Sequence, residues 1–215
     1  MLMKAFGMIE VYSFTTAVVA ADTMAKAGNV KVIAFDRNRP ISPDVPAPLV
    51  MIVKIEGEVA AVRAAVEAGV NYAKEKGKYI VSHIIPRPDE DTENMAYLMD
   101  INKDKYNKKI PKSFRGLEVE APAKKGSIGL LEVQGLVASI EGLDAMLKTS
   151  DVRLVHTEKR LGGRLVTIVI TGSVSAVKSA VEAGNKNASE LGEIFGCEVI
   201  ANPHDEILKF FDMEV

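Results

Sequence analysis

The sequence contains the same five residues twice, and this repeat constrains the fold more than any other feature. Residues 65–69 read Ala-Val-Glu-Ala-Gly, and residues 180–184 read the same. When the two segments are superimposed, further residues coincide in one frame without a gap: Gly57 with Gly172, Val59 with Val174, Gly77 with Gly192, and Pro88 with Pro203. Agreement over this length indicates that the chain consists of two copies of one structural unit.

The upstream parts of the two copies also match, in a frame shifted by seven residues. The matching residues are Gly7, Glu10, Val11, Asp22, Met24, Lys26 and Val30, with Gly129, Glu132, Val133, Asp144, Met146, Lys148 and Val152. The shift falls in one loop, which spans residues 37–49 in the first copy and only 159–164 in the second. We therefore expect this loop to be the main difference between the copies.

Composition narrows the class of protein. Two copies in 215 residues give units of roughly 90 to 100 residues, enough for each to bury a core. A net charge of -2 and the absence of Trp predict neither nucleic-acid nor membrane binding. The single cysteine, Cys197, cannot form a disulfide within the chain, which is typical of a reducing compartment. Because no signal or membrane-spanning segment is apparent, we expect a cytoplasmic protein.

Apolar periodicity predicts the same order of elements in both copies. In the first copy, strands are expected at residues 3–11, 30–36, 50–56 and 79–85, and helices at 15–27 and 59–76. In the second copy, strands are expected up to residue 133 and at 152–158, 165–171 and 194–201, with helices at 137–148, 174–191 and from 203. This order is that of the ferredoxin-like fold, an α+β fold with a four-stranded antiparallel sheet and helices on one face.

The segment between the copies has a different composition. Residues 89–99 have the spacing of a short amphipathic helix, and residues 102–125 are polar, rich in lysine and interrupted by prolines. We interpret 102–125 as a linker. The predicted domains are therefore residues 1–101 and 126–215.

Several motifs together resemble a known family. The first strands read Gly-Met-Ile-Glu-Val at 7–11 and Gly-Leu-Leu-Glu-Val at 129–133, and the first helices carry Asp-Thr-Met-Ala-Lys-Ala at 22–27 and Asp-Ala-Met-Leu-Lys at 144–148. Ile-Ile-Pro-Arg-Pro closes the first copy at 84–88. With the paired Ala-Val-Glu-Ala-Gly helices, this set resembles the tandem-domain shell proteins of bacterial microcompartments (BMC). The resemblance covers essentially the whole chain, and the strand-first order of both copies matches the non-permuted class.

The resemblance implies an architecture and a role. It implies two tandem ferredoxin-like BMC domains, and a homotrimer that imitates a hexagon. Such a trimer tiles with other shell proteins at its edges and has a central pore for small metabolites. This is a structural role in the shell, not that of an enzyme. A different class of function also fits the repeat, namely a tandem ferredoxin-like regulatory module that binds a small metabolite.

In the family, the loop between the second and third strands lines the pore. The resemblance therefore predicts pore-lining residues in both loops: Pro40, Ile41, Ser42, Pro43 and Asp44 in the first copy, and Lys159, Arg160, Leu161, Gly162 and Gly163 in the second. Lys159, Arg160 and Arg164 form a positive collar for small anions if they face the lumen, or are ordinary solvated cations of a turn. The proline-rich first loop is expected to be stiff, and either plugs the pore or lies as a lid on the disc face.

Other positions are expected at the tiling edge. Lys26 and Lys148 match the lysine that the family places between neighbouring hexagons, and Arg87 matches its edge arginine, although the twin of Arg87 is Asn202. The alternative for both lysines is a cation that stabilises a helix C-terminus.

No catalytic or cofactor site is expected. The three histidines lack the spacing of metal ligands, and no phosphate-binding or nucleophile motif occurs. Some tandem shell proteins hold an iron–sulfur cluster on a pore-loop cysteine, but neither loop has one here. Cys197 aligns with Ser82, where a small buried apolar side chain is expected.

Overall fold

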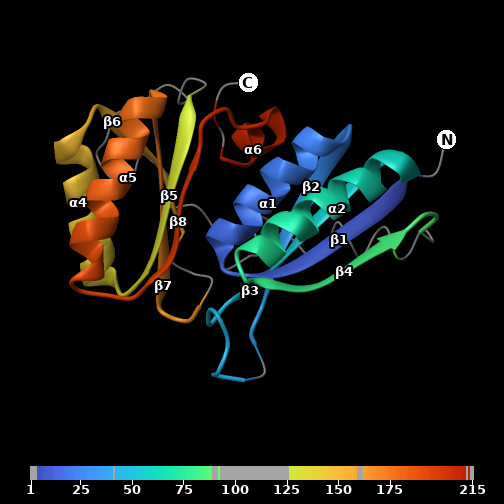
Figure 1. Ribbon diagram of the computed structural model, residues 1–215, viewed down its shortest axis with the longest axis horizontal. Coiled ribbons are helices and arrows are strands. Elements are labelled where there is room, and N and C mark those ends of the chain that lie inside the picture. Colours follow the sequence, from blue (N-terminus) through green and yellow to red (C-terminus); the bar gives the residue numbers. More distant parts are fainter. Residues whose placement is uncertain are drawn as a thin grey trace, which may run out of the picture.

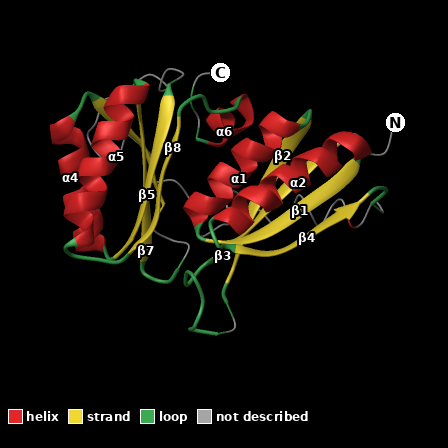
Figure 2. Ribbon diagram, viewed as in Figure 1, coloured by secondary structure: helices red, strands yellow, loops and turns green. Residues whose placement is uncertain are grey.

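The computed structural model describes residues 4–40, 42–88, 92, 126–158, 162–211 and 213 (Figure 1). These residues form two four-stranded antiparallel sheets, with strand orders β2-β3-β1-β4 and β6-β7-β5-β8. Each sheet carries two long helices on one face (Figure 2). The predicted fold class, two tandem ferredoxin-like domains, is confirmed.

The elements follow one another in the same order in each copy. The first copy contains β1 (Ala5–Tyr12), α1 (Phe14–Ala27), β2 (Val30–Asn38), β3 (Val50–Gly57), α2 (Val59–Glu75) and β4 (Tyr79–Ile85). The second contains β5 (Ser127–Gln134), α4 (Leu136–Thr149), β6 (Val152–Glu158), β7 (Leu165–Gly172), α5 (Val174–Ser189), β8 (Ile194–Ile200) and α6 (Asp205–Phe210). The helix expected at 89–99 and the linker at 102–125 lie outside the described residues, apart from Thr92, so the domain boundaries stay a prediction.

The glycines of the repeated motifs are sites of close packing. A Cβ atom on Gly7 of β1 would lie 2.7 Å from Val62 Cγ1 of α2, and one on Gly129 of β5 would lie 2.6 Å from Val181 Cγ2 of α5. The glycine of the pentapeptide does the same between helices, because a Cβ on Gly69 would lie 2.6 Å from Met24 Cγ. Any larger residue would push these layers apart. The repeated glycines therefore mark two close packing contacts in each copy, one between a strand and a helix and one between two helices.

The two copies share one hydrophobic core. In Figure 1, α4 and α5 lie on the side of the second sheet that faces away from the first copy, and α1 lies on the other side. Phe14 of α1 belongs to the same buried cluster as Leu130 and Val169 of the second sheet. A separate cluster fills the space between that sheet and α4 and α5. The second sheet is thus buried on both faces, once by its own helices and once by the first copy.

One carboxylate lies at the centre of this contact, which we call the intrachain junction. Glu132 of β5 is fully buried, and its oxygens accept hydrogen bonds from Ser13 Oγ at 2.7 Å, Phe14 N at 3.3 Å and Thr15 N at 2.8 Å. The first N–H groups of a helix have no partner within the helix, and they favour a negative charge. A carboxylate of the second copy therefore accepts hydrogen bonds from the unpaired N–H groups at the start of a helix in the first copy.

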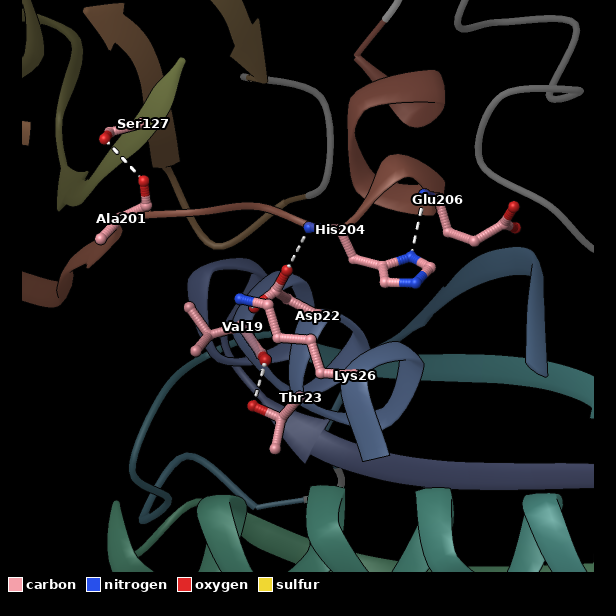
Figure 3. Close-up of polar contacts among 8 residues, drawn as sticks. All are labelled: Val19, Asp22, Thr23, Lys26, Ser127, Ala201, His204 and Glu206. Carbon is pink, nitrogen blue, oxygen red and sulfur yellow. Dashed lines mark hydrogen bonds and ion pairs between the residues drawn. The ribbon is translucent and has the colours of Figure 1, made fainter. Parts of the chain in front are cut away.

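The C-terminal helix holds the copies together at a second point. The backbone N–H of His204 donates to Asp22 Oδ1 of α1 at 2.8 Å, while His204 Nδ1 accepts from Glu206 N at 3.2 Å (Figure 3). Glu206 Oε2 in turn accepts from the N–H of Val32 in β2 at 3.0 Å. Helix α6 is therefore part of the intrachain junction, although it follows the second copy in sequence.

The junction predicts a large stability effect at Glu132. Replacing it by alanine (Glu132→Ala) leaves the hydroxyl of Ser13 and two backbone N–H groups without their acceptor in a buried site. We expect the free energy of unfolding, measured by urea denaturation, to fall by about 1–3 kcal/mol.

A matched control is Glu67→Ala, which removes an exposed glutamate from the repeated pentapeptide. That change is expected to stay within about 0.5 kcal/mol of the parent protein. Equal effects of the two substitutions would show that Glu132 does not stabilise the junction.

Candidate functional site

The loops predicted to line a pore lie against each other. One loop joins β2 to β3 and the other joins β6 to β7, and a Cβ on Gly163 would lie 2.8 Å from Pro48 Cγ. Gln134 Nε2 also donates to the carbonyl oxygen of Gly163 at 3.1 Å. The two loops are far apart in sequence, and tertiary structure brings them together at the same end of the molecule (Figure 1).

Both loops are anchored by equivalent hydrogen bonds. The N–H of Ser13 donates to the carbonyl of Leu49 at 2.9 Å, and the N–H of Gly135 donates to the carbonyl of Arg164 at 2.9 Å. Each bond joins the last residue of a loop to the residue that precedes the first helix of its copy. The loops therefore differ in length but end at the same point of the fold.

The short loop has a backbone that strongly favours glycine. Gly162, Gly163 and Arg164 all have positive φ values, of 112°, 64° and 60°. Glycine adopts such values without steric cost, whereas other residues are strained there. No atom lies within 4 Å of a Cβ built on Gly162, so this residue borders open space.

The proline-rich loop packs beside the second copy and is internally ordered. Ser42 Oγ accepts from Asp44 N at 3.2 Å, and the carbonyl of Pro43 accepts from Val45 N at 3.0 Å. Between this loop and the second copy lies an open pocket of about 610 Å³, lined by Pro43, Asp44, Val45, Pro46, Pro48, Gln134, Glu193 and Phe195. The lining residues from the second copy could not be recognised from sequence, because only tertiary structure places them beside the loop.

The pore-lining predictions fall partly on described residues. Pro40, Ser42, Pro43, Asp44, Gly162 and Gly163 belong to the two adjacent loops. Ile41, Lys159, Arg160 and Leu161 lie outside the described residues.

The lysines predicted at the tiling edge occupy equivalent positions in the last turns of α1 and α4. Lys26 Nζ lies 2.5 Å from Asp22 Oδ2, and Lys148 Nζ lies 2.5 Å from Asp144 Oδ2. Hydrogen bonding to Asp144 raises the pKa of Lys148. Arg87 is exposed just after β4. Both lysines thus lie near a helix C-terminus, as the alternative prediction requires. Both are also exposed enough to contact a neighbour.

The described residues contain no group of three or more His, Cys, Asp or Glu side chains placed to hold a metal ion. Cys197 is half-buried in β8 and packs against the core of the second copy. Burial, and to a lesser extent the charge of Glu198, raises the pKa of its thiol. No helix in the described part of the chain is long and apolar enough to span a membrane.

Comparison with known proteins decides the family. The model of the BMC domain matches residues 5–88 and again residues 127–203, which correspond to the two copies. The chain belongs to the BMC domain family. It is a tandem-domain microcompartment shell protein in which neither domain is permuted, because each begins with the strand that lies in the middle of its sheet.

The relatives of this BMC protein match either nearly all of the chain or less than half of it. The carboxysome assembly protein CcmO of Synechococcus elongatus is 33% identical over 209 residues, which cover 95% of this chain and 67% of the relative. The microcompartment shell protein PduA of Salmonella typhimurium is 43% identical over 83 residues, covering 39% of this chain and 87% of PduA. EutM of Escherichia coli is 41% identical over 85 residues, covering 40% of this chain and 87% of EutM.

A crystal structure of a microcompartment protein from Desulfitobacterium hafniense also aligns with the shell protein. It covers 96% of this chain and 99% of its own length at 27% identity, with a TM-score of 0.39.

The contact between Gly163 and Pro48 predicts a difference between the two neighbouring glycines. Gly163→Val forces a side chain into Pro48 and is expected to detach the proline-rich loop, so that backbone amides of residues 42–49 exchange hydrogen faster. Hydrogen–deuterium exchange read by mass spectrometry measures this effect. Gly162→Val is the control, because it introduces similar backbone strain without contacting Pro48. Equal exchange in both variants would contradict the prediction.

Proposed function

We propose that three copies of this shell protein close into a ring of six domains, a pseudohexamer, with a central pore that passes small metabolites. Three two-domain chains supply the six units of a hexagonal disc. This role is structural rather than catalytic, and it places the protein in the shell of a cytoplasmic microcompartment.

The intrachain junction carries this proposal. It is a head-to-tail contact, in which the α1 side of one domain meets the β5–β8 sheet face of the other. Contacts between two different surfaces repeat until they close a ring or extend as a filament. The counterpart of the α1 surface in the second domain is exposed: Leu136, Val137 and Ile140 are 59%, 72% and 60% exposed, whereas Phe14, Thr15 and Val18 are at most 1% exposed.

The adjacent loops support a pore. Rotational symmetry would gather three copies of each loop around one axis. Lys159, Arg160 and Arg164 would then form a positive collar that favours small anions. The longer proline-rich loop would narrow or plug the opening, with Ser42 and Asp44 as its polar groups.

The rim of such a disc would contact other shell proteins. Lys26, Arg87 and Lys148 are the proposed contacts, and all three are partly or fully exposed in the single chain. Because the second domain has Asn202 in place of the edge arginine, its edge would select a different neighbour from that of the first.

A second function is favoured by one observation. The pocket of about 610 Å³ between the proline-rich loop and the second domain has the size of a small-molecule site. A regulatory module that binds a metabolite there would not need to tile. Oligomeric state separates these functions, because a regulator stays a small discrete particle and responds to its ligand.

The test of the proposed function is the mass and shape of the protein in solution. Sedimentation velocity is expected to give about three times the chain mass of 23.2 kDa. Negative-stain electron microscopy is expected to show hexagonal discs or sheets. A monomer or dimer at every concentration would reject the trimer and favour the regulatory module.

The edge assignment predicts a selective defect in tiling. The double variant Lys26→Ala/Lys148→Ala is expected to keep the trimer mass but to form fewer or smaller sheets in electron micrographs. The control Lys178→Ala removes an exposed lysine from α5 and is expected to tile normally. Sheets of normal size from the double variant would show that neither lysine is needed for contact at the edge.

The pore assignment predicts that a large side chain at residue 162 obstructs passage. Gly162→Phe places a ring in open space and adds the backbone strain of a side chain at positive φ, about 1–3 kcal/mol, so the trimer is still expected to assemble. The measured quantity is the rate at which an enzyme enclosed in reconstituted shells consumes an added anionic substrate, which we expect to fall severalfold. An unchanged rate with intact shells would count against a pore at this loop.

A further inference from the structure

We propose that the pocket beside the proline-rich loop binds a small organic cation, a molecule with an ammonium group and a short apolar part. This inference rests on the second candidate function, for which it names the class of ligand. It does not depend on the ring, because all the lining residues belong to one chain.

The lining combines carboxylates with apolar surface. Asp44 of the loop and Glu193, immediately before β8, supply the two carboxylates, while Phe195, Pro43 and Pro46 supply apolar surface. A carboxylate accepts hydrogen bonds but donates none, and an aromatic ring attracts a cation to its face. The lining therefore fits a ligand that carries N–H donors, a positive charge and a short alkyl group.

The two lining carboxylates have no partner among the described residues, which form neither an ion pair with them nor a hydrogen bond to them. Both residues are exposed. The lysines of this part of the molecule have other partners: Lys76 Nζ lies 2.5 Å from Glu198 Oε1, and Lys78 Nζ donates to the carbonyl of Phe195. The pocket carboxylates are therefore available to a cation from solution.

The loop wall of the pocket is fixed before any ligand binds. Ala47 and Leu49 are 0% and 1% exposed, whereas Pro43 and Asp44 are exposed. The N–H of Asp44 donates to Ser42 Oγ at 3.2 Å, and the prolines restrict the backbone around it. Because little of the loop has to be ordered on binding, the entropic cost of binding a ligand is low.

The opposite wall is fixed by hydrogen bonds at the ends of two strands. The N–H of Gln134 donates to the carbonyl of Glu193 at 2.9 Å, and Gln134 Nε2 donates to the carbonyl of Gly163 at 3.1 Å. These bonds hold the side chains of the second domain beside the loop. They also leave the amide oxygen of Gln134 as a third acceptor in the lining.

The carboxylate of Glu193 is not required by the repeated fold. The equivalent hydrogen bond in the first copy runs from the N–H of Tyr12 to the carbonyl of Lys78 at 2.9 Å, so Lys78 is the counterpart of Glu193. The short loop at 159–164 also lacks the prolines that build the loop wall. The combination of two carboxylates with a proline-rich wall therefore occurs once in the chain.

A cation bound between Asp44 and Glu193 joins the proline-rich loop to the second domain. Opening the loop would separate the cation from one of its two carboxylates, so a bound cation reduces opening. In the proposed ring, where this loop narrows the pore, the ligand would hold the loop in place.

The experiment measures hydrogen–deuterium exchange of residues 42–49 in the full chain during titration with three probes of similar size. The probes are propylammonium, propan-1-ol and propionate. Propylammonium is expected to slow exchange at concentrations at which the other two leave it unchanged. Asp44→Asn and Glu193→Gln are each expected to raise the midpoint of the titration about two- to fivefold, because exposed ion pairs are weak.

The control is Glu182→Gln, which removes an exposed carboxylate of α5 that does not line the pocket. It is expected to leave the midpoint unchanged. The double variant Asp44→Asn/Glu193→Gln is expected to lose the preference for propylammonium. Circular dichroism is expected to show all these variants folded, because the substituted residues are exposed.

Equal effects of the three probes, or a preference for propylammonium that survives in the double variant, would overturn the site. Sedimentation velocity on the same samples distinguishes this inference from the proposed ring. A trimer without a preference for propylammonium would reject the site and leave the ring. A monomer that keeps the preference would support the site and reject the ring.

Discussion

The structure depends on an apolar contact between a helix of one domain and the sheet of the other, with one buried carboxylate at its centre. Helix α1 covers the face of the second sheet that its own helices leave open, and the two domains therefore share a core. The start of a helix carries unpaired N–H groups, which are costly to bury without an acceptor. Glu132 supplies that acceptor from the other domain. Because β5, β8 and α6 all hold α1, the loops of the two domains are brought to one place.

Duplication explains why the two halves fold alike and yet behave differently. Glycines such as Gly7 and Gly129 occur in both copies because each helix packs directly on a strand. The surfaces that face other domains have no such common constraint. Thr15 and Gly196 lie against each other in the contact between the domains, whereas their counterparts Val137 and Val81 are exposed. The copies have therefore diverged at their outer surfaces while keeping the same interior packing.

Loop length is the second difference with a functional meaning. Both loops end at equivalent backbone hydrogen bonds, so the additional residues of the first loop extend it without moving its attachment. Prolines restrict its backbone, and Gly163 packs against Pro48. In the proposed ring, three long, rigid loops would alternate with three short ones. The opening would therefore have threefold rather than sixfold symmetry.

The sequence by itself determined the repeat, the order and approximate bounds of the elements, and the fold of each domain. These follow from local periodicity and from glycines that each copy requires. It also located the two loops, since the frame shift can fall nowhere else. Tertiary structure alone decided that Glu132 is buried while its twin Glu10 is not, because the difference lies in the domain packed above each strand. It likewise decided that Gly163 contacts Pro48, and that Glu198 pairs with Lys76. Contacts between domains depend on two surfaces at once, and periodicity within one segment carries no information about the surface that it will meet.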